Sequence, residues 1–197
     1  MDDLPNDAAE PAEPDSARLR EIRAAAEVEA EKHTVLVRTQ RAGRLVSGAM
    51  LPWFLVHPPQ GYAVLTTIGR KTGKKRRTCV RVIRRDNLAY LVQLTPPHIA
   101  MSRPGAPSGW LLNIRAHPHV RIRLPDGTFD GVGREITDPT ERAIARTILC
   151  ETVTPTDYGE CALHLRGRPS RTKIQELHRY WFDTGNPLVI ELEHRPA

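Results

Sequence analysis

The residues best suited to chemistry are a dense group of cations in the middle of the chain. Nine basic residues and no acidic ones lie between Arg70 and Arg85, while the whole chain carries a formal net charge of only +6. The remaining residues are therefore net acidic, and the excess positive charge is local. A local positive field attracts one defined anion or anionic surface. The nine cations are Arg70, Lys71, Lys74, Lys75, Arg76, Arg77, Arg81, Arg84 and Arg85.

The two kinds of cation in this group favour different contacts with an anion. Arginine can hold a phosphate or carboxylate through two parallel hydrogen bonds, whereas lysine acts as a point charge. We expect Arg70 and Arg76 to act in the first way, and Lys71 and Lys74 in the second. The alternative is a solvated hairpin whose charges prevent an edge strand from pairing with other chains.

Two predicted strands position these cations. Residues 63–68 are rich in β-forming side chains, and residues 78–84 alternate apolar and basic side chains. Between the two strands, Gly69 and Gly73 permit a tight turn and allow a ligand to approach the backbone closely. The sequence therefore predicts a basic hairpin.

The rest of the chain contains further short strands and several helices. Strands are predicted at residues 88–94, 120–124, 128–135 and 188–192, and helices at 17–32, 34–47, 110–116, 139–151 and around 174–181. The proline-rich residues 95–109 and the segment that carries Tyr158 are predicted to be loops. Six strands in hairpins, without alternating β-α-β units, predict a mainly β (α+β) fold, a six-stranded antiparallel barrel with peripheral helices.

The common catalytic and metal-binding signatures are missing from the sequence. It contains no Gly-x-Ser-x-Gly, His-Glu-x-x-His or Cys-x-x-Cys motif and no phosphate-binding loop of the nucleotidase type. His117 and His119 have no acidic or cysteine partner nearby, so we expect no metal site. An odd number of cysteines without metal spacing suits a reducing cytoplasm. An enzyme with these residues would depend on a cofactor for its chemistry.

The N-terminal part of the chain is predicted to lie outside the barrel. Residues 1–15 are acidic and proline-rich and predict a disordered tail, residues 16–60 a helical extension, and residues 61–197 the barrel domain. Residues 34–56 combine a basic amphipathic stretch with an apolar run that is too short to span a bilayer. They could lie on an anionic membrane, which would make the protein peripheral at the inner face of the cell membrane, or they could cover the barrel.

Three stretches of the sequence together resemble the deazaflavin-dependent nitroreductase family, split β-barrel proteins that bind coenzyme F-420 and occur mainly in actinobacteria. These stretches are residues 65–80 (LTTIGRKTGKKRRTCV), 110–120 (WLLNIRAHPHV) and 134–142 (REITDPTER). The resemblance covers residues 61–192 and implies a split β-barrel with a deazaflavin in a groove.

The resemblance also implies which residues contact the cofactor. Arg70, Lys71 and Arg76 would hold its phosphodiester and oligoglutamate tail, while Trp110 and Asn113 would border its ring. The other cofactor-binding residues that it implies are Thr67, Gly69, Thr78, Cys79, Arg81, Gln93 and Thr95.

The predicted function is an F-420-dependent oxidoreductase that transfers hydride between the deazaflavin and a quinone, nitro compound or other small organic acceptor. FMN suits the site less well, because it offers one terminal phosphate to nine basic residues. Tyr158 is a candidate for substrate contact or proton donation, with a packing or surface role as the alternative. The alternative function is a noncatalytic binder of nucleic acid or of an anionic membrane. Nucleic acid is not expected as a partner, because only 5% of the residues are aromatic.

Overall fold

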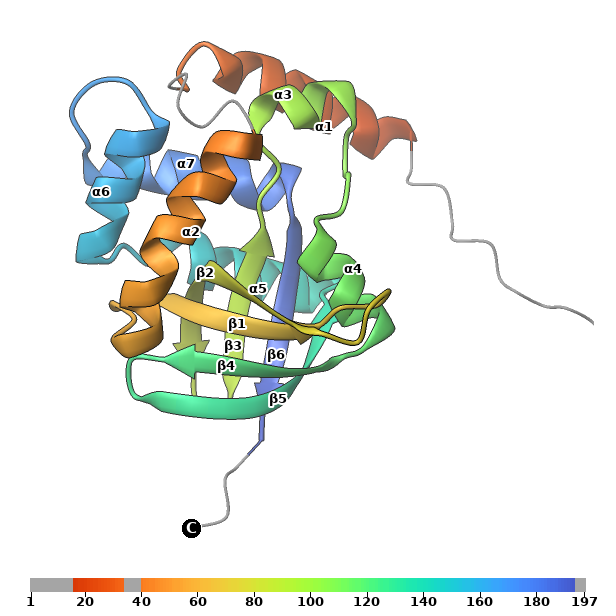
Figure 1. The fold of residues 1–197 in the computed structure, drawn as a ribbon. Coiled ribbons are helices and arrows are strands. Elements are labelled where there is room, and N and C mark those ends of the chain that lie inside the picture. The colour runs from red at the N-terminus through yellow and green to blue at the C-terminus, as the bar shows by residue number, and fades with distance from the viewer. Residues whose placement is uncertain (1–15, 34–39, 194–197) are drawn as a thin grey trace, which may run out of the picture.

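The computed structural model describes residues 16–33 and 40–193, which build a single closed barrel of six antiparallel strands with helices around it (Figure 1). The strands are β1 (Tyr62–Ile68), β2 (Lys75–Arg85), β3 (Leu88–Gln93), β4 (His119–Leu124), β5 (Gly127–Glu135) and β6 (Asn186–Leu192). They follow one another in the order β1, β2, β3, β6, β5, β4, and β4 pairs with β1 to close the barrel. The predicted six-stranded antiparallel barrel is confirmed.

Side chains from all six strands fill the barrel. Leu65, Leu91, Ile122 and Ile190 are fully buried there, because alternate residues of each strand point inward. The first four residues of β1 are buried on both faces, since helix α2 covers the outer face of the strand. This double burial explains why β1 is an almost continuous apolar run in the sequence.

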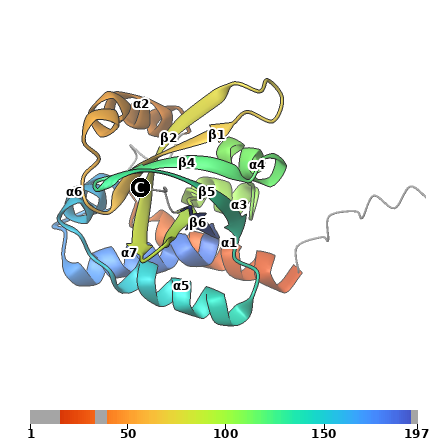
Figure 2. The same cartoon turned by 90° about the horizontal axis from the view of Figure 1, so that it is seen from below.

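Seven helices of the described ranges surround the barrel. They are α1 (Ser16–Ala30), α2 (Gln40–Val56), α3 (Pro97–Ser102), α4 (Gly109–Ala116), α5 (Pro139–Glu151), α6 (Pro155–His164) and α7 (Arg171–Thr184). Helices α5 and α7 lie side by side against the barrel, and α2 lies on the other side (Figures 1 and 2). Ile83 and Tyr90 of the barrel pack against Leu149 of α5 and Phe182 of α7.

Capping residues define the start of α5 as the sequence predicted. The side chain of Asp138 accepts a hydrogen bond of 2.7 Å from the backbone N–H of Glu141, and Pro139 occupies the first helical position. Capping therefore accounts for Asp138, while the carboxylate of Glu141 pairs with Arg134 at 2.8 Å.

Two predicted loops contain helices. The proline-rich segment 95–109 includes α3, because Pro97 stands at the first turn, where its missing N–H costs no hydrogen bond. The segment with Tyr158 is α6, which begins after Thr154, whose backbone N–H donates to the carboxylate of Asp157 at 2.6 Å. This reciprocal cap and Pro155 are local signals of a helix start, which the prediction of a loop did not take into account.

Other boundaries shift by a few residues. Strand β2 begins at Lys75 instead of residue 78, so three of the cations belong to the strand and not to the turn. Helix α2 continues through Pro52 to Val56. The predicted acidic tail, residues 1–15, and the predicted start of the second helix, residues 34–39, lie outside the described residues.

Candidate functional site

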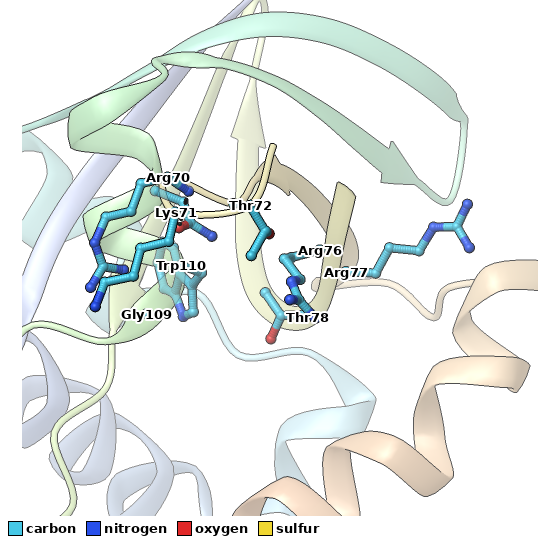
Figure 3. A pocket seen from close by; sticks show the side chains of 10 residues that line it. Arg70, Lys71, Thr72, Arg76, Arg77, Thr78, Gly109 and Trp110 are labelled. Atoms are coloured by element: carbon cyan, nitrogen blue, oxygen red, sulfur yellow. Dashed lines mark hydrogen bonds between the residues drawn. The ribbon is translucent and has the colours of Figure 1, made fainter. Parts of the chain in front are cut away.

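A small basic pocket of about 400 Å³ lies at the tip of the β1–β2 hairpin (Figure 3). Its walls come from the hairpin turn, from the first residues of β2 and from the start of α4. The residues that line it are Gly69, Arg70, Lys71, Thr72, Arg76, Arg77, Thr78, Gly109, Trp110 and Asn113. Most of the residues predicted to hold an anionic tail therefore meet here, together with the predicted indole.

The turn that carries the first cations is tight. The backbone N–H of Gly69 donates to the carbonyl of Lys74 at 2.9 Å, and the N–H of Gly73 donates to the carbonyl of Gly69 at 2.7 Å. Gly73 has a φ of +66°, which favours glycine. In Figure 3, Arg70 and Lys71 point down beside Trp110, while Arg77 points away from its neighbour Arg76, as expected from strand alternation.

Asn113 connects the hairpin to α4. Its side-chain oxygen accepts a hydrogen bond of 3.1 Å from the backbone N–H of Arg70, and its side-chain nitrogen donates to the hydroxyl of Thr67, also at 3.1 Å. Both Asn113 and Thr67 are buried. The structure thus uses these two predicted ligand-binding residues to fix the hairpin against the helix, a role that the sequence did not indicate.

The cations of the basic pocket lack acidic partners. Within residues 16–33 and 40–193, no ion pair involves any cation between Arg70 and Arg77. Several arginines elsewhere on the barrel are paired: Arg84 lies 2.6 Å from Asp126, and Arg121 lies 2.7 Å from Asp130. The charges at the pocket are therefore available to an anion.

A second and larger cavity, of about 1130 Å³, adjoins the basic pocket. Arg77, Thr78, Gly109 and Trp110 line both. The cavity lies where β2 leaves its neighbour, since β2 pairs with β3 only through residues 82–85. Its walls come from β1, β2, the end of β3, the segment that follows β3, and helices α2, α6 and α7.

Four further predicted residues, Cys79, Arg81, Gln93 and Thr95, line this large cavity and not the basic pocket. Burial raises the pKa of the Cys79 thiol to about 11, so the thiol stays protonated. The amide of Gln93 donates to the carbonyl of Leu94 at 2.7 Å, and its side-chain oxygen accepts from Asn186 at 2.8 Å. The polar groups of Gln93 are thus already used inside the protein.

The side chain of Arg81 makes its hydrogen bonds and its ion pair within the protein. Its guanidinium lies 3.0 Å from the carboxylate of Asp157 and donates to the backbone carbonyls of Leu149 and Thr152. Burial alone would raise the pKa of Asp157, but the hydrogen bonds and charge of Arg81 lower it. Burial and the nearby Arg81 lower the pKa of His178, also in contact with this pair, to about 3, which keeps its ring neutral.

Tyr158 lines neither pocket. It lies on α6 with its side chain exposed, while Glu160 on the same helix lines the large cavity. The hydroxyl of Tyr62 donates a hydrogen bond to the carboxylate of Glu160. Burial raises the pKa of Glu160 to about 7. Glu160 was missed because no local pattern distinguishes it from a solvated helix residue.

Sequence reasoning also missed Thr72, Arg77 and Gly109 of the basic pocket. Each of the three lies next in the sequence to a predicted cofactor-binding residue, and this position is the signal that could have indicated them. His117 and His119 are both exposed, and the part of the chain that the structure describes holds no cluster of three metal-binding side chains.

The arrangement as a whole can hold an elongated anion attached to a flat group. Exposed cations surround the small pocket, Gly109 and Trp110 of the first turn of α4 line it, and Trp110 stands where this pocket meets the large cavity. The anionic part fits the basic pocket, and the flat part fits beside Trp110, which leaves room in the large cavity for a second molecule.

Comparison with protein families gives one match. Residues 54–162 match the model of a family described as F420H(2)-dependent quinone reductase. This segment covers more than half of the chain and contains the basic pocket and Glu160. No curated protein matches the chain.

Several solved structures resemble the chain at low identity. An F420-H2 dependent reductase, FDR-A, is 21% identical, with 67% of this chain and 95% of that chain covered and a TM-score of 0.44. A conserved hypothetical protein from Mycobacterium tuberculosis is 18% identical, with 76% and 81% covered and a TM-score of 0.41. An FAD-binding protein from Mesorhizobium loti is 13% identical, with 75% and 91% covered and a TM-score of 0.38.

Proposed function

Because this chain belongs to the F420H(2)-dependent quinone reductase family, and is thereby an oxidoreductase that uses coenzyme F-420, we propose that it reduces a quinone bound in the large cavity. The expected deazaflavin dependence is confirmed by this membership. The observation that carries the proposed acceptor is the junction of the two pockets at Thr78 and Trp110, which gives the coenzyme and an acceptor adjoining spaces.

The residues of the basic pocket suit the coenzyme. A deazaflavin with a phosphodiester and several glutamate carboxylates needs many positive partners, and Arg70, Lys71 and Arg76 pair with no carboxylate of the described residues. We infer that these three hold the tail, and that Thr78 and Trp110 border the ring. When bound in its reduced form, the coenzyme supplies hydride to the acceptor.

The protein then contributes position and exclusion of water. The hairpin, fixed by Asn113, sets the distance between the cations and Trp110. The apolar walls of the large cavity, among them Phe54 and Trp181, shield the acceptor from solvent and hold it flat. The coenzyme and acceptor thus meet in a preformed arrangement.

The noncatalytic alternatives gain no support from this geometry. Arg70, Lys71, Arg76 and Arg77 surround a pocket of limited volume beside an indole, and these four cations do not form the long stripe that would follow a nucleic acid backbone. FMN would leave most of these charges without a partner.

The proposed acceptor is tested by turnover. Purified protein is supplied with reduced coenzyme F-420 and either menadione, a small quinone, or a nitroimidazole of similar size, and reoxidation of the coenzyme is followed by absorbance. We expect a higher kcat/KM with menadione. A preference for the nitro compound, or no reaction with either acceptor, would contradict the proposal.

We also propose that the outer face of α2 contacts the anionic inner face of the cell membrane, where quinones with lipid tails reside. Leu45, Trp53 and Val56 are exposed at helical spacing on α2, while Phe54 packs on the barrel. The basic hairpin lies along the same edge of the molecule (Figure 2). None of the helices in the described ranges is long and apolar enough to cross a bilayer.

Membrane contact predicts that Trp53→Ser lowers co-sedimentation with vesicles of phosphatidylglycerol several-fold, because the largest exposed apolar side chain of α2 is lost. Ile144→Ser, which removes an exposed apolar residue from α5, serves as the matched control and should bind as the wild type does. Equal binding by both variants and the wild type would exclude this face.

A further inference from the structure

A carboxyl group and a phenol meet on the wall of the large cavity. Glu160 of α6 accepts a hydrogen bond from the hydroxyl of Tyr62, at the start of β1, through its Oε2 atom. The other carboxyl oxygen, Oε1, has no hydrogen-bond partner among residues 16–33 and 40–193. Both residues line the cavity, so the pair can be reached by a molecule bound there.

The surroundings keep a proton on this pair near neutral pH. Tyr62 is buried, and its ring packs edge-on against Phe54 with the ring centroids 5.6 Å apart. Burial raises the pKa of Glu160 to about 7, against the opposite effects of the Tyr62 hydrogen bond and of Arg81. Burial also raises the pKa of Tyr62. Of the two groups, Glu160 is therefore the one that can release a proton at physiological pH.

The charged groups around Glu160 compensate one another. Arg81 of β2 and Asp157 of α6 form the buried ion pair described above. His164 of α6 and His178 of α7 stay neutral, because burial lowers their pKa values to about 4 and about 3. Cys79 of β2 keeps its proton. Among these groups, Glu160 is thus the one whose pKa lies near 7.

The pair stands at a suitable distance from the place where the two pockets meet. Tyr62 lies opposite Arg81 in the β1–β2 ladder, three residues along β2 from Thr78. Three residues of strand correspond to about 10 Å. A flat acceptor that touches the coenzyme near Thr78 can therefore reach Glu160 with its far side.

We propose that Glu160 is the acid that protonates the acceptor, and that Tyr62 is the positioning residue that holds its carboxyl at the cavity wall. This inference rests on the proposed function, since a quinone that has received hydride carries one negative charge on oxygen. The O–H bond of Glu160 breaks as a new O–H bond forms on the acceptor, which leaves as hydroquinone. The quinone is reduced by the hydride and this proton, the oxidised coenzyme would leave its second hydrogen in the solvent as a proton, and the solvent returns a proton to Glu160.

The proton-donor role is tested with Glu160→Gln and Tyr62→Phe in the menadione assay. In the wild type, kcat should fall above about pH 7, as Glu160 loses its proton. Glu160→Gln should lower kcat about 100-fold at pH 6 without raising KM, and should remove this limb of the pH profile. Tyr62→Phe should move the limb to higher pH, because the carboxylate loses a hydrogen-bond donor. Glu151→Gln, on the exposed end of α5, is the control and should match the wild type.

A second measurement needs no coenzyme. The infrared band of a protonated carboxylic acid should be present in the wild type at pH 6, disappear by pH 8, and be absent from Glu160→Gln at both values. A missing band, or a Glu160→Gln profile like that of the wild type, would overturn the role of Glu160. Absence of menadione reduction by the wild type would instead overturn the proposed function together with this inference.

Discussion

Replacing Arg70, Lys71 and Arg76 together with alanine is expected to weaken the binding of oxidised coenzyme F-420 by about 150-fold, a loss of about 3 kcal/mol. Each of these exposed cations contributes about 1 kcal/mol, at the upper end for exposed ion pairs, because the coenzyme tail presents several anions to them at once. Fluorescence titration of the coenzyme measures the change. The fold should be unaffected, since none of the three side chains forms an ion pair in the described parts of the protein.

A charge-matched control separates the pocket from the general positive field. Lys74→Ala/Lys75→Ala/Arg85→Ala removes the same number of charges from the same hairpin and strand, but none of these residues lines the basic pocket. This control should lower the affinity only a few-fold, through the loss of long-range attraction. Equal losses in the two triple variants would show that the coenzyme tail does not enter the basic pocket. Titration with FMN should show weak binding to every variant.

Asp157→Ala is expected to lower the free energy of unfolding by about 3–5 kcal/mol, because it leaves the buried guanidinium of Arg81 without its counter-charge. For a domain of this size the melting temperature should fall by about 6–20 °C. Arg81→Met/Asp157→Leu should cost less than Asp157→Ala, since it removes both charges and replaces them with apolar side chains. Thermal denaturation at pH 7.5 measures all three proteins. A double variant that is less stable than Asp157→Ala would contradict this account.

The exposed pair of Arg121 and Asp130 provides the control for this prediction. Its side chains are more than half exposed and lie 2.7 Å apart, so Asp130→Ala should leave the melting temperature close to that of the wild type. The buried pair of Arg81 and Asp157 also makes the free energy of unfolding depend on pH. Since the folded state lowers the pKa of Asp157, its contribution is present above the usual carboxyl pKa and is lost as the pH falls through the folded value.

Local patterns were sufficient to predict the barrel and the basic hairpin. Alternation along residues 78–84, the glycines of the turn and the cap at Asp138 each act within a few residues, and the structure agrees with all of them. The basic pocket was also accessible in part, because its cations are neighbours in the sequence. Two segments that contain proline were predicted to be loops but contain helices, because proline is also favoured in the first turn of a helix, where Pro97 and Pro155 lie.

The large cavity could not be predicted in the same way. It depends on where β2 parts from β3 and on contacts between residues about 100 positions apart, such as Tyr62 and Glu160. The burial of Arg81 is likewise a long-range effect, since its partner lies on α6. The sequence predicts that Arg81 is one more cation of the basic group. In the folded protein, however, its guanidinium forms a buried ion pair with Asp157.

The double hydrogen bond of Asn113 has a consequence for how such sites change in evolution. One side chain anchors the backbone at Arg70 and the hydroxyl of Thr67 to the helix that bears Trp110. Because one side chain fixes both elements, the turn that binds the anionic tail and the helix that borders the ring system are held at a set separation. A substitution that displaces one of them would also displace the other. Grafting this specificity onto another barrel would require transplanting the turn and the helix as a single module.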